Sequence, residues 1–206
     1  PLLALSFYAV VGSWSLDYLL QATMGGFSNV GAEQAQQLFA GLLDSPMRMI
    51  VSFSLMLVGV AVVVGTGLRK GIEKVSMFMM PALAVLLVLL AGYAAVVGAS
   101  AQAWQFMFDA DFSKLNPEVI LMALGQSLFS IAIGTGALLA YGAYLPKDVS
   151  IPRAAWVIAL ADTTAAVLAG LLIFPIVFAS GLDVSEGPGL IFVTMPVAFA
   201  NMPGAQ

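Results

Sequence analysis

The most constraining feature of the sequence is an uncharged run from Val119 to Pro146 that has weak helix formers at its centre. A helix rises about 1.5 Å per residue, so this run is longer than the roughly 30 Å hydrocarbon core of a bilayer. Asn116 and Pro117 supply a helix start, because asparagine caps a helix and proline suits its first position. The pattern predicts a membrane-spanning helix over residues 117–144.

The centre of this predicted helix favours a break. Ala132, Gly134 and Gly136, with the hydroxyls of Ser130 and Thr135 among them, stand where a lipid-facing helix would carry leucine. Unwound backbone at this depth is tolerated only inside protein, where it lines a site. Carbonyls that end the first half-helix could hold a cation or an ammonium group, and amides that open the second could meet a carboxylate. A continuous helix with closely packed glycines stays open as the alternative.

Composition places the chain among all-α integral membrane proteins. Apolar residues make up 61% of it, charged residues 9%, and the mean hydropathy is +1.02. The absence of cysteine and histidine excludes disulfides, thiolate or histidine metal sites and histidine proton relays. The net charge is −4, and we expect no nucleic-acid partner. The chain starts in an apolar run without methionine and stops in a loop, so we expect an internal fragment.

Four further spans and an external loop follow from the uncharged runs. The polar stretch after the first span contains a short amphipathic helix, and Pro81 is expected to interrupt the third span. The predicted single transmembrane domain covers residues 1–206, with spans at about 1–24, 48–68, 75–97, 117–144 and 154–179 and a re-entrant external loop at 180–206.

Basic residues set the expected orientation of these spans. Five of the seven lysines and arginines fall in two short loops on one side, which should be cytoplasmic. The chain is then expected to enter from inside, to cross five times and to leave its last loop outside. These five residues are Arg69, Lys70, Lys74, Lys147 and Arg153.

Two aspartates lie within predicted spans. Asp162 stands well inside the fifth span on a face of small residues, so it should point toward protein and either be protonated or hold a cation. A neutral acid bonded to a backbone carbonyl is the open alternative. Asp17 lies near the end of the first span, where an acid usually meets water. Together they raise a diaspartyl membrane protease as an enzyme alternative, but SWSLDYLL and IALADTTA lack the contexts of that class, so we expect no enzyme.

Several segments, in order, resemble the neurotransmitter:sodium symporter family, in its bacterial branch. GQSLFSIAIGTGALLAYGAYLPKD is similar to the sixth transmembrane helix of that family, and SFYAVVGSWSLDYLL to the third. GLRKGIEKVSMFMMP resembles the connection from the fourth to the fifth helix, IALADTTAAVLAGLLIFP the seventh, and GPGLIFVTMPVAFANMPG the following external loop. The resemblance implies helices three to seven of a leucine-transporter-like inverted-repeat bundle with one broken helix.

The resemblance also implies a substrate site. Tyr8 matches a tyrosine that binds the substrate carboxylate, and Phe129 matches an aromatic lid that closes the site from outside. Backbone carbonyls at the end of the first half-helix would receive the substrate amine, and small residues would shape a pocket for a larger side chain. The implied substrate-binding residues are Ala4, Tyr8, Phe129, Ser130, Ala132 and Thr135.

A sodium site and gates follow from the same resemblance. Ser130 and Asp162 match ligands of the first sodium, although many members carry asparagine at the second position. Members that need chloride use it as a nearby negative charge, at a site that includes a glutamine matched by Gln126. Asp162 would supply that charge itself, so chloride should not be required. The implied gating residues are Phe129, Tyr144, Gly71 and Pro81.

The resemblance therefore implies a sodium-coupled symporter in the bacterial inner membrane. It would import a small hydrophobic or aromatic amino acid by alternating access, with sodium ions and the lipid bilayer as its other partners. A proton-coupled permease of the same fold, with Asp162 as the proton carrier, is the alternative. Whether the protein forms a homodimer, and which amino acid it carries, stay open.

Overall fold

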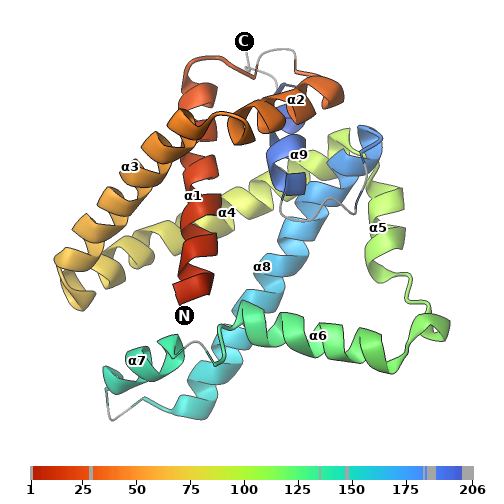
Figure 1. Cartoon of the computed structure of the whole chain (residues 1–206). Coiled ribbons are helices and arrows are strands. Elements are labelled where there is room, and N and C mark those ends of the chain that lie inside the picture. The colour runs from red at the N-terminus through yellow and green to blue at the C-terminus, as the bar shows by residue number, and fades with distance from the viewer. Residues whose placement is uncertain are drawn as a thin grey trace.

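The computed structural model describes residues 2–27, 30–134, 136–146, 149–182, 184 and 189–200. Within these ranges the chain consists of helices and their connections, with no strand, which confirms the predicted all-α class (Figure 1). The elements are α1 (Leu2–Thr23), α2 (Ala32–Leu43), α3 (Pro46–Gly65), the π-helix η1 (Leu68–Glu73), α4 (Lys74–Val97), α5 (Ser100–Phe108), the 3-10 helix η2 (Phe112–Lys114), α6 (Pro117–Ser130), α7 (Ala137–Ala143), α8 (Ile151–Ala179) and α9 (Gly189–Ala200).

Four of the described helices are long and apolar enough to cross a membrane. They are Leu2–Thr23, Pro46–Gly65, Lys70–Val97 and Ile151–Ala179. α6 and α7 are each too short to cross alone at about 1.5 Å per residue. The fourth predicted span is thus divided into two helices, and whether it crosses the bilayer stays a prediction.

Prolines mark where several helices begin. Pro46, Pro117 and Pro152 occupy first-turn positions, where the missing amide proton costs nothing. The Asn116 side chain adds a cap to α6, because its Oδ1 accepts a hydrogen bond of 2.8 Å from the amide of Val119. The ends of these elements therefore follow from local sequence.

The prediction that Pro81 interrupts the third span is wrong for this conformation. α4 continues through Pro81 as far as Val97. A proline removes one backbone hydrogen bond, and the rest of this long helix retains enough of the others to stay wound.

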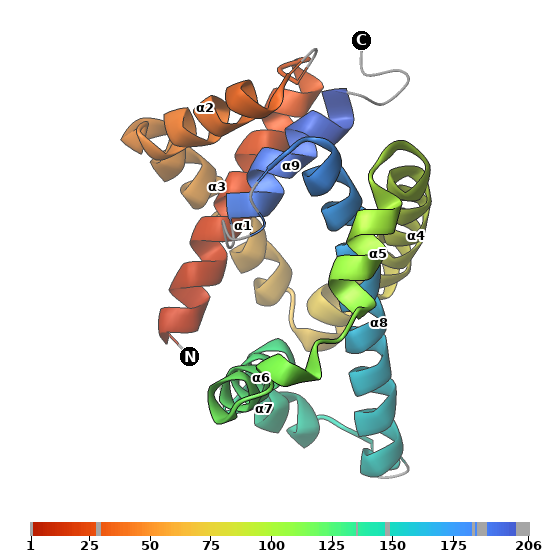
Figure 2. The same ribbon diagram turned by 90° about the vertical axis from the view of Figure 1, so that its right-hand side faces the viewer.

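Two pairs of helices form the frame of the molecule (Figures 1 and 2). α3 packs on α1, and α8 packs on α4 and α5. Ala91 and Ala94 on α4 pack in one cluster with Leu172 and Ile176 on α8. The small side chains of the two alanines let the two backbones approach closely, as is common between membrane helices. At the end of α4 the amide of Ala99 donates a hydrogen bond of 2.9 Å to the carbonyl of Pro175 in α8.

α9 covers one end of α1 and α2. Phe192 on α9 packs against Trp14 and Tyr18 of α1 and Phe39 of α2, with ring centroids 5.3 to 5.6 Å apart. The sequence analysis predicts a folded-back loop here but no helix, because glycine and proline are frequent in residues 180–206. α5 is likewise a helix within a stretch predicted only as a connection.

An exposed turn joins α5 to α6. Asp111 accepts hydrogen bonds from the hydroxyl and the amide of Ser113 and pairs with Lys114 at 3.4 Å. The hydrogen bonds from Ser113, followed by the one from Lys114, hold the pKa of the Asp111 carboxyl below its usual range.

The corner between α3 and α4 depends on a glycine. η1 turns the chain back at this corner, and a Cβ at Gly71 would overlap the carbonyl oxygen of Val63 and the hydroxyl of Thr66. No other residue fits this position without moving the backbone of α3.

The variant Gly71→Ala should therefore lower the thermal stability of the intact protein. We expect a loss of about 1–3 kcal/mol, the usual cost of forcing an extra carbon into a packed site. Gly59→Ala is the matched control, because a Cβ on Gly59 in α3 meets nothing within 4 Å. The measurement is the melting temperature of each variant in detergent. Equal melting temperatures would contradict this account of η1.

Candidate functional site

α6 ends in a closed cap that its own backbone forms. The amide of Ala132 donates to the carbonyl of Phe129 at 3.1 Å, and the amide of Ile133 donates to the carbonyl of Leu128 at 2.9 Å. These two bonds form a Schellman motif, which requires a left-handed residue after the helix. Ala132 occupies that position with a φ of 58°. A left-handed alanine costs on the order of 1–3 kcal/mol, so the surrounding structure must hold it in place.

Two glycines carry the chain from α6 into α7. Gly134 and Gly136 have φ values of 87° and 82°, and α7 begins at Ala137 directly after them. Glycine adopts such angles at little cost. The predicted broken helix is confirmed, and the alternative of a continuous helix with packed glycines is excluded. Thr135 lies outside the described residues.

Ser130, the last residue of α6, contacts Asp162 of α8. Its hydroxyl lies 2.8 and 2.7 Å from the two carboxylate oxygens and donates a hydrogen bond shared between them. Asp162 is half-buried, and its side-chain partner is a hydroxyl rather than the backbone carbonyl of the alternative interpretation. Three oxygens therefore converge at the carbonyl end of a helix, where the helix dipole is negative. Such an arrangement favours a cation.

Tyr8 reaches the same end of α6 from α1. Its ring stacks on Phe129 with centroids 5.9 Å apart and an interplanar angle of 19°. Both rings are about half-exposed, and Ala4 lies half-buried one helical turn before Tyr8. Phe129 and Ser130 are adjacent in sequence, so the end of α6 joins α1 on one side and α8 on the other. The phenol of Tyr8 and the carboxylate of Asp162 thus lie on the two sides of the break after α6.

Other residues expected from the sequence lie outside this meeting point. Gln126 is exposed on α6, one turn before Ser130. Tyr144 follows α7 and is 71% exposed. Gly71 and Pro81 lie on η1 and α4, at the corner where α3 meets α4. The structure therefore brings Tyr8 together with Phe129, and Ser130 together with Asp162. Of the expected gating residues only Phe129 lies at this meeting point.

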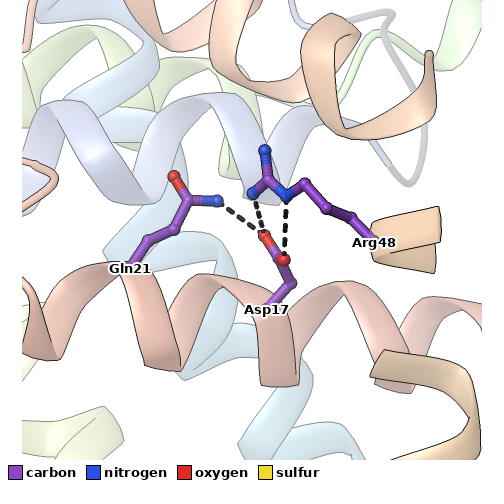
Figure 3. A network of polar contacts seen from close by, with 3 residues as sticks. All are labelled: Asp17, Gln21 and Arg48. Carbon is purple, nitrogen blue, oxygen red and sulfur yellow. Dashed lines mark hydrogen bonds and ion pairs between the residues drawn. The ribbon is translucent and has the colours of Figure 1, made fainter. Parts of the chain in front are cut away.

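An ion pair between the buried Asp17 of α1 and the half-exposed Arg48 of α3 is the feature that the sequence analysis misses (Figure 3). Asp17 is only 7% exposed, so the expectation that it meets water is wrong. Arg48, in the first turn of α3, donates to it from Nη2 at 2.7 Å and from Nε at 3.4 Å, and Gln21 donates from Nε2 at 2.6 Å. The sequence does offer one signal for this pair, because the basic residue Arg48 starts the next predicted span.

The two aspartates of the predicted spans have different partners. Asp17 is engaged by Arg48, while Asp162 accepts from Ser130 on another helix. A diaspartyl protease needs two carboxylates that share one site. The structure therefore gives the protease alternative no paired acids.

Comparison with known proteins identifies the family. The model of the sodium:neurotransmitter symporter family matches residues 33–206. The chain therefore belongs to the sodium:neurotransmitter symporter family, as the sequence resemblance implies. With its long apolar helices, it belongs to a multi-pass membrane protein.

Individual relatives agree with this assignment. An uncharacterized sodium-dependent transporter of Bacillus subtilis (strain 168), YhdH, is 37% identical over 98% of this chain and 45% of its own length. An uncharacterized sodium-dependent transporter of Haemophilus influenzae is 26% identical over 96% of this chain and 44% of its own length. This chain thus spans less than half the length of these relatives.

A solved structure matches the fold. The crystal structure of MhsT in complex with L-phenylalanine superimposes on this chain with a TM-score of 0.91 and 39% sequence identity. The match covers 98% of this chain and 46% of MhsT. The arrangement of helices described above is therefore that of a leucine-transporter-like fold.

The positive φ of Gly136 gives a test of the break. Gly136→Ala should destabilise the intact protein by about 1–2 kcal/mol, because L-residues other than glycine are strained in the left-handed region. Gly125→Ala, in the middle of α6 with nothing near its Cβ position, should be neutral or stabilising. A melting temperature for Gly136→Ala equal to that of Gly125→Ala would be inconsistent with the left-handed start of α7.

Proposed function

We propose that this chain forms the ion- and substrate-binding region of a sodium-coupled symporter that imports a small hydrophobic or aromatic amino acid. The observation that carries the proposal is the broken end of α6, which joins the Ser130 hydroxyl to the Asp162 carboxylate and stacks Phe129 on Tyr8. Family membership supports transport, and the names of the relatives from Bacillus subtilis and Haemophilus influenzae support sodium dependence.

Sodium would bind between α6 and α8. Asp162 and Ser130 would donate oxygen ligands after the Ser130 hydroxyl turns its proton away from the carboxylate, which a hydroxyl can do by rotation. At 4 Å and an effective dielectric constant of 20, attraction between the carboxylate and a monovalent cation is about 4 kcal/mol. This is of the size needed to offset the burial of a carboxylate at membrane depth.

The amino acid would bind between α1 and α6. The Tyr8 hydroxyl would donate to its carboxylate, and carbonyls of Phe129, Ser130 and Ala132 would accept from its ammonium group. The carbonyl of Phe129 already accepts from Ala132, and its second lone pair can serve the ligand. Phe129 would then cover the bound molecule from outside.

An apolar side chain fits the pocket proposed here. Ala4 and Ala132 are small, and Thr135 is proposed as the third pocket-shaping residue. The rings of Tyr8 and Phe129 offer aromatic faces that favour an aromatic or aliphatic partner. MhsT was solved in complex with L-phenylalanine, which agrees with a ligand of this class.

Alternating access would require the site to open toward each side in turn. Phe129 is proposed as the outer lid and Tyr144, after α7, as a residue of the cytoplasmic gate. Gly71 and Pro81 would let the start of α4 unwind so that water from the cytoplasm of a bacterial cell reaches a second sodium site, which the family resemblance implies on other helices. In the present conformation this segment is wound.

The charge of Asp162 leads to a prediction about ions. Asp162→Asn in the intact protein should weaken sodium-dependent binding of the amino acid, or make it depend on chloride, because the amide supplies no negative charge. Gln126 would then contribute to the chloride site. Radioligand binding in sodium chloride and in sodium gluconate measures both effects, with the exposed carboxylate variant Asp44→Asn as control. Unchanged sodium affinity without chloride would refute this role of Asp162. Uptake into vesicles that is driven by a pH gradient and indifferent to sodium would favour the proton-coupled alternative.

The hydroxyl of Tyr8 leads to a second prediction. Tyr8→Phe should lower affinity for the amino acid about tenfold or more, since a hydrogen bond to a charged group contributes roughly 1.5–3 kcal/mol. The stack on Phe129 should survive, because phenylalanine keeps the ring. Equilibrium binding of the amino acid to the folded variant measures this affinity. An affinity equal to that of the wild type would contradict the proposed contact between the Tyr8 hydroxyl and the carboxylate.

A further inference from the structure

The interface between α1 and α3 is a ladder of residues spaced by one helical turn. Arg48, Ser52 and Met56 recur every four positions along α3 and so share one face. Opposite them on α1, Ser13 and Asp17 are buried, as is Ser52 on α3. The two helices are joined by the ion pair at one end of this ladder. Further along, the Met56 methyl covers Gly12 so closely that a Cβ on the glycine would lie 2.8 Å from it.

The ion pair is the directional part of this ladder. The Asp17 side chain is 10% exposed, whereas that of Arg48 is 44% exposed. The guanidinium reaches both carboxylate oxygens of Asp17, and Gln21 adds a third donor one turn along α1 (Figure 3). Paired donors of a planar guanidinium fix orientation as well as distance. Apolar contacts alone would let α1 rotate more freely on α3.

Tyr8 lies one helical turn before Gly12, the residue that Met56 of α3 covers. Nine positions separate Tyr8 from Asp17, which at about 3.6 residues per turn is two and a half turns. The rotation of α1 on α3 therefore bears on where the Tyr8 ring points, together with its stack on Phe129.

We propose that Asp17, held by Arg48 and Gln21, is a positioning residue that sets the rotation of α1 and so aims the Tyr8 hydroxyl at the amino-acid carboxylate. This inference rests on the substrate role proposed above for Tyr8. Asp17 acts through Tyr8 and does not touch the ligand. An ion pair that only stabilised the fold would have no reason to affect one contact of the ligand more than another.

A double-mutant cycle on the intact protein tests the proposal, with L-phenylalanine as the probe. Asp17→Asn keeps the shape of the side chain but removes the charge that holds Arg48. We expect it to weaken sodium-dependent binding about tenfold, as residues remote from a ligand can do. In a Tyr8→Phe background the same change should add nothing, because the hydroxyl that it aims is already absent.

A second ligand separates positioning from folding. Phenethylamine, which lacks the carboxylate, should bind equally to the wild type and to Asp17→Asn if it binds through the carbonyls of α6 alone. Asp111→Asn is the matched control, since it removes an aspartate from an exposed ion pair with Lys114 and should change neither affinity.

Two outcomes would overturn the inference. An equal loss for Asp17→Asn in the wild-type and Tyr8→Phe backgrounds would assign the ion pair to stability alone, and no loss in either would leave it without this role. If Asp17→Asn does not fold, Arg48→Lys keeps the charge but loses the planar fork, and its smaller loss should likewise vanish with Tyr8→Phe. Absence of sodium-dependent amino-acid binding in the wild type would instead remove the proposed function.

Discussion

The structure depends on one constraint, which is that backbone polar groups inside a bilayer need partners. α6 stops at Ser130, and the chain passes through the left-handed residues Ala132, Gly134 and Gly136 before α7 begins. The Schellman bonds pair part of this backbone, and lipid offers no hydrogen-bond partner to backbone groups. At membrane depth such a break is tolerated only where it is buried in protein or lines a water-filled cavity. The proposed site follows from this requirement.

The break also connects the two halves of the frame. α1 and α3 form one pair, and α4 and α8 form the other, with η1 joining them at one corner and α9 packed near the opposite end of α1 (Figures 1 and 2). Phe129 contacts the first pair through Tyr8, and Ser130 contacts the second through Asp162. An amino acid at the first contact and a sodium ion at the second would therefore touch neighbouring residues of α6. This adjacency gives a physical reason why binding of one should favour binding of the other.

Much of the site could be predicted from the sequence because its signals are local. Glycines clustered with hydroxyl residues in the middle of an uncharged run favour a break, and an aspartate on a face of alanines favours a protein-facing side. The contact between Ser130 and Asp162 joins residues far apart in sequence, and the family resemblance supplied that pairing. Helix starts were also predictable, since Asn116 and three prolines mark them.

Features that depend on tertiary packing could not be predicted in this way. Asp17 is buried because Arg48 reaches it from another helix, and nothing around Asp17 in the sequence names that partner. α9 forms in spite of Pro196 because aromatic rings of α1 and α2 pack against Phe192. α4 stays wound at Pro81 because a long helix loses only one backbone hydrogen bond there. In each case packing outweighed the local preference of the chain.

The most direct test of the central claim is an experimental structure of the intact protein with sodium and L-phenylalanine bound. The account predicts a cation between the Ser130 hydroxyl and the Asp162 carboxylate, and a ligand carboxylate within about 3 Å of the Tyr8 hydroxyl. A structure in which α6 and α7 form one uninterrupted helix, or in which ion and ligand bind away from these residues, would contradict it.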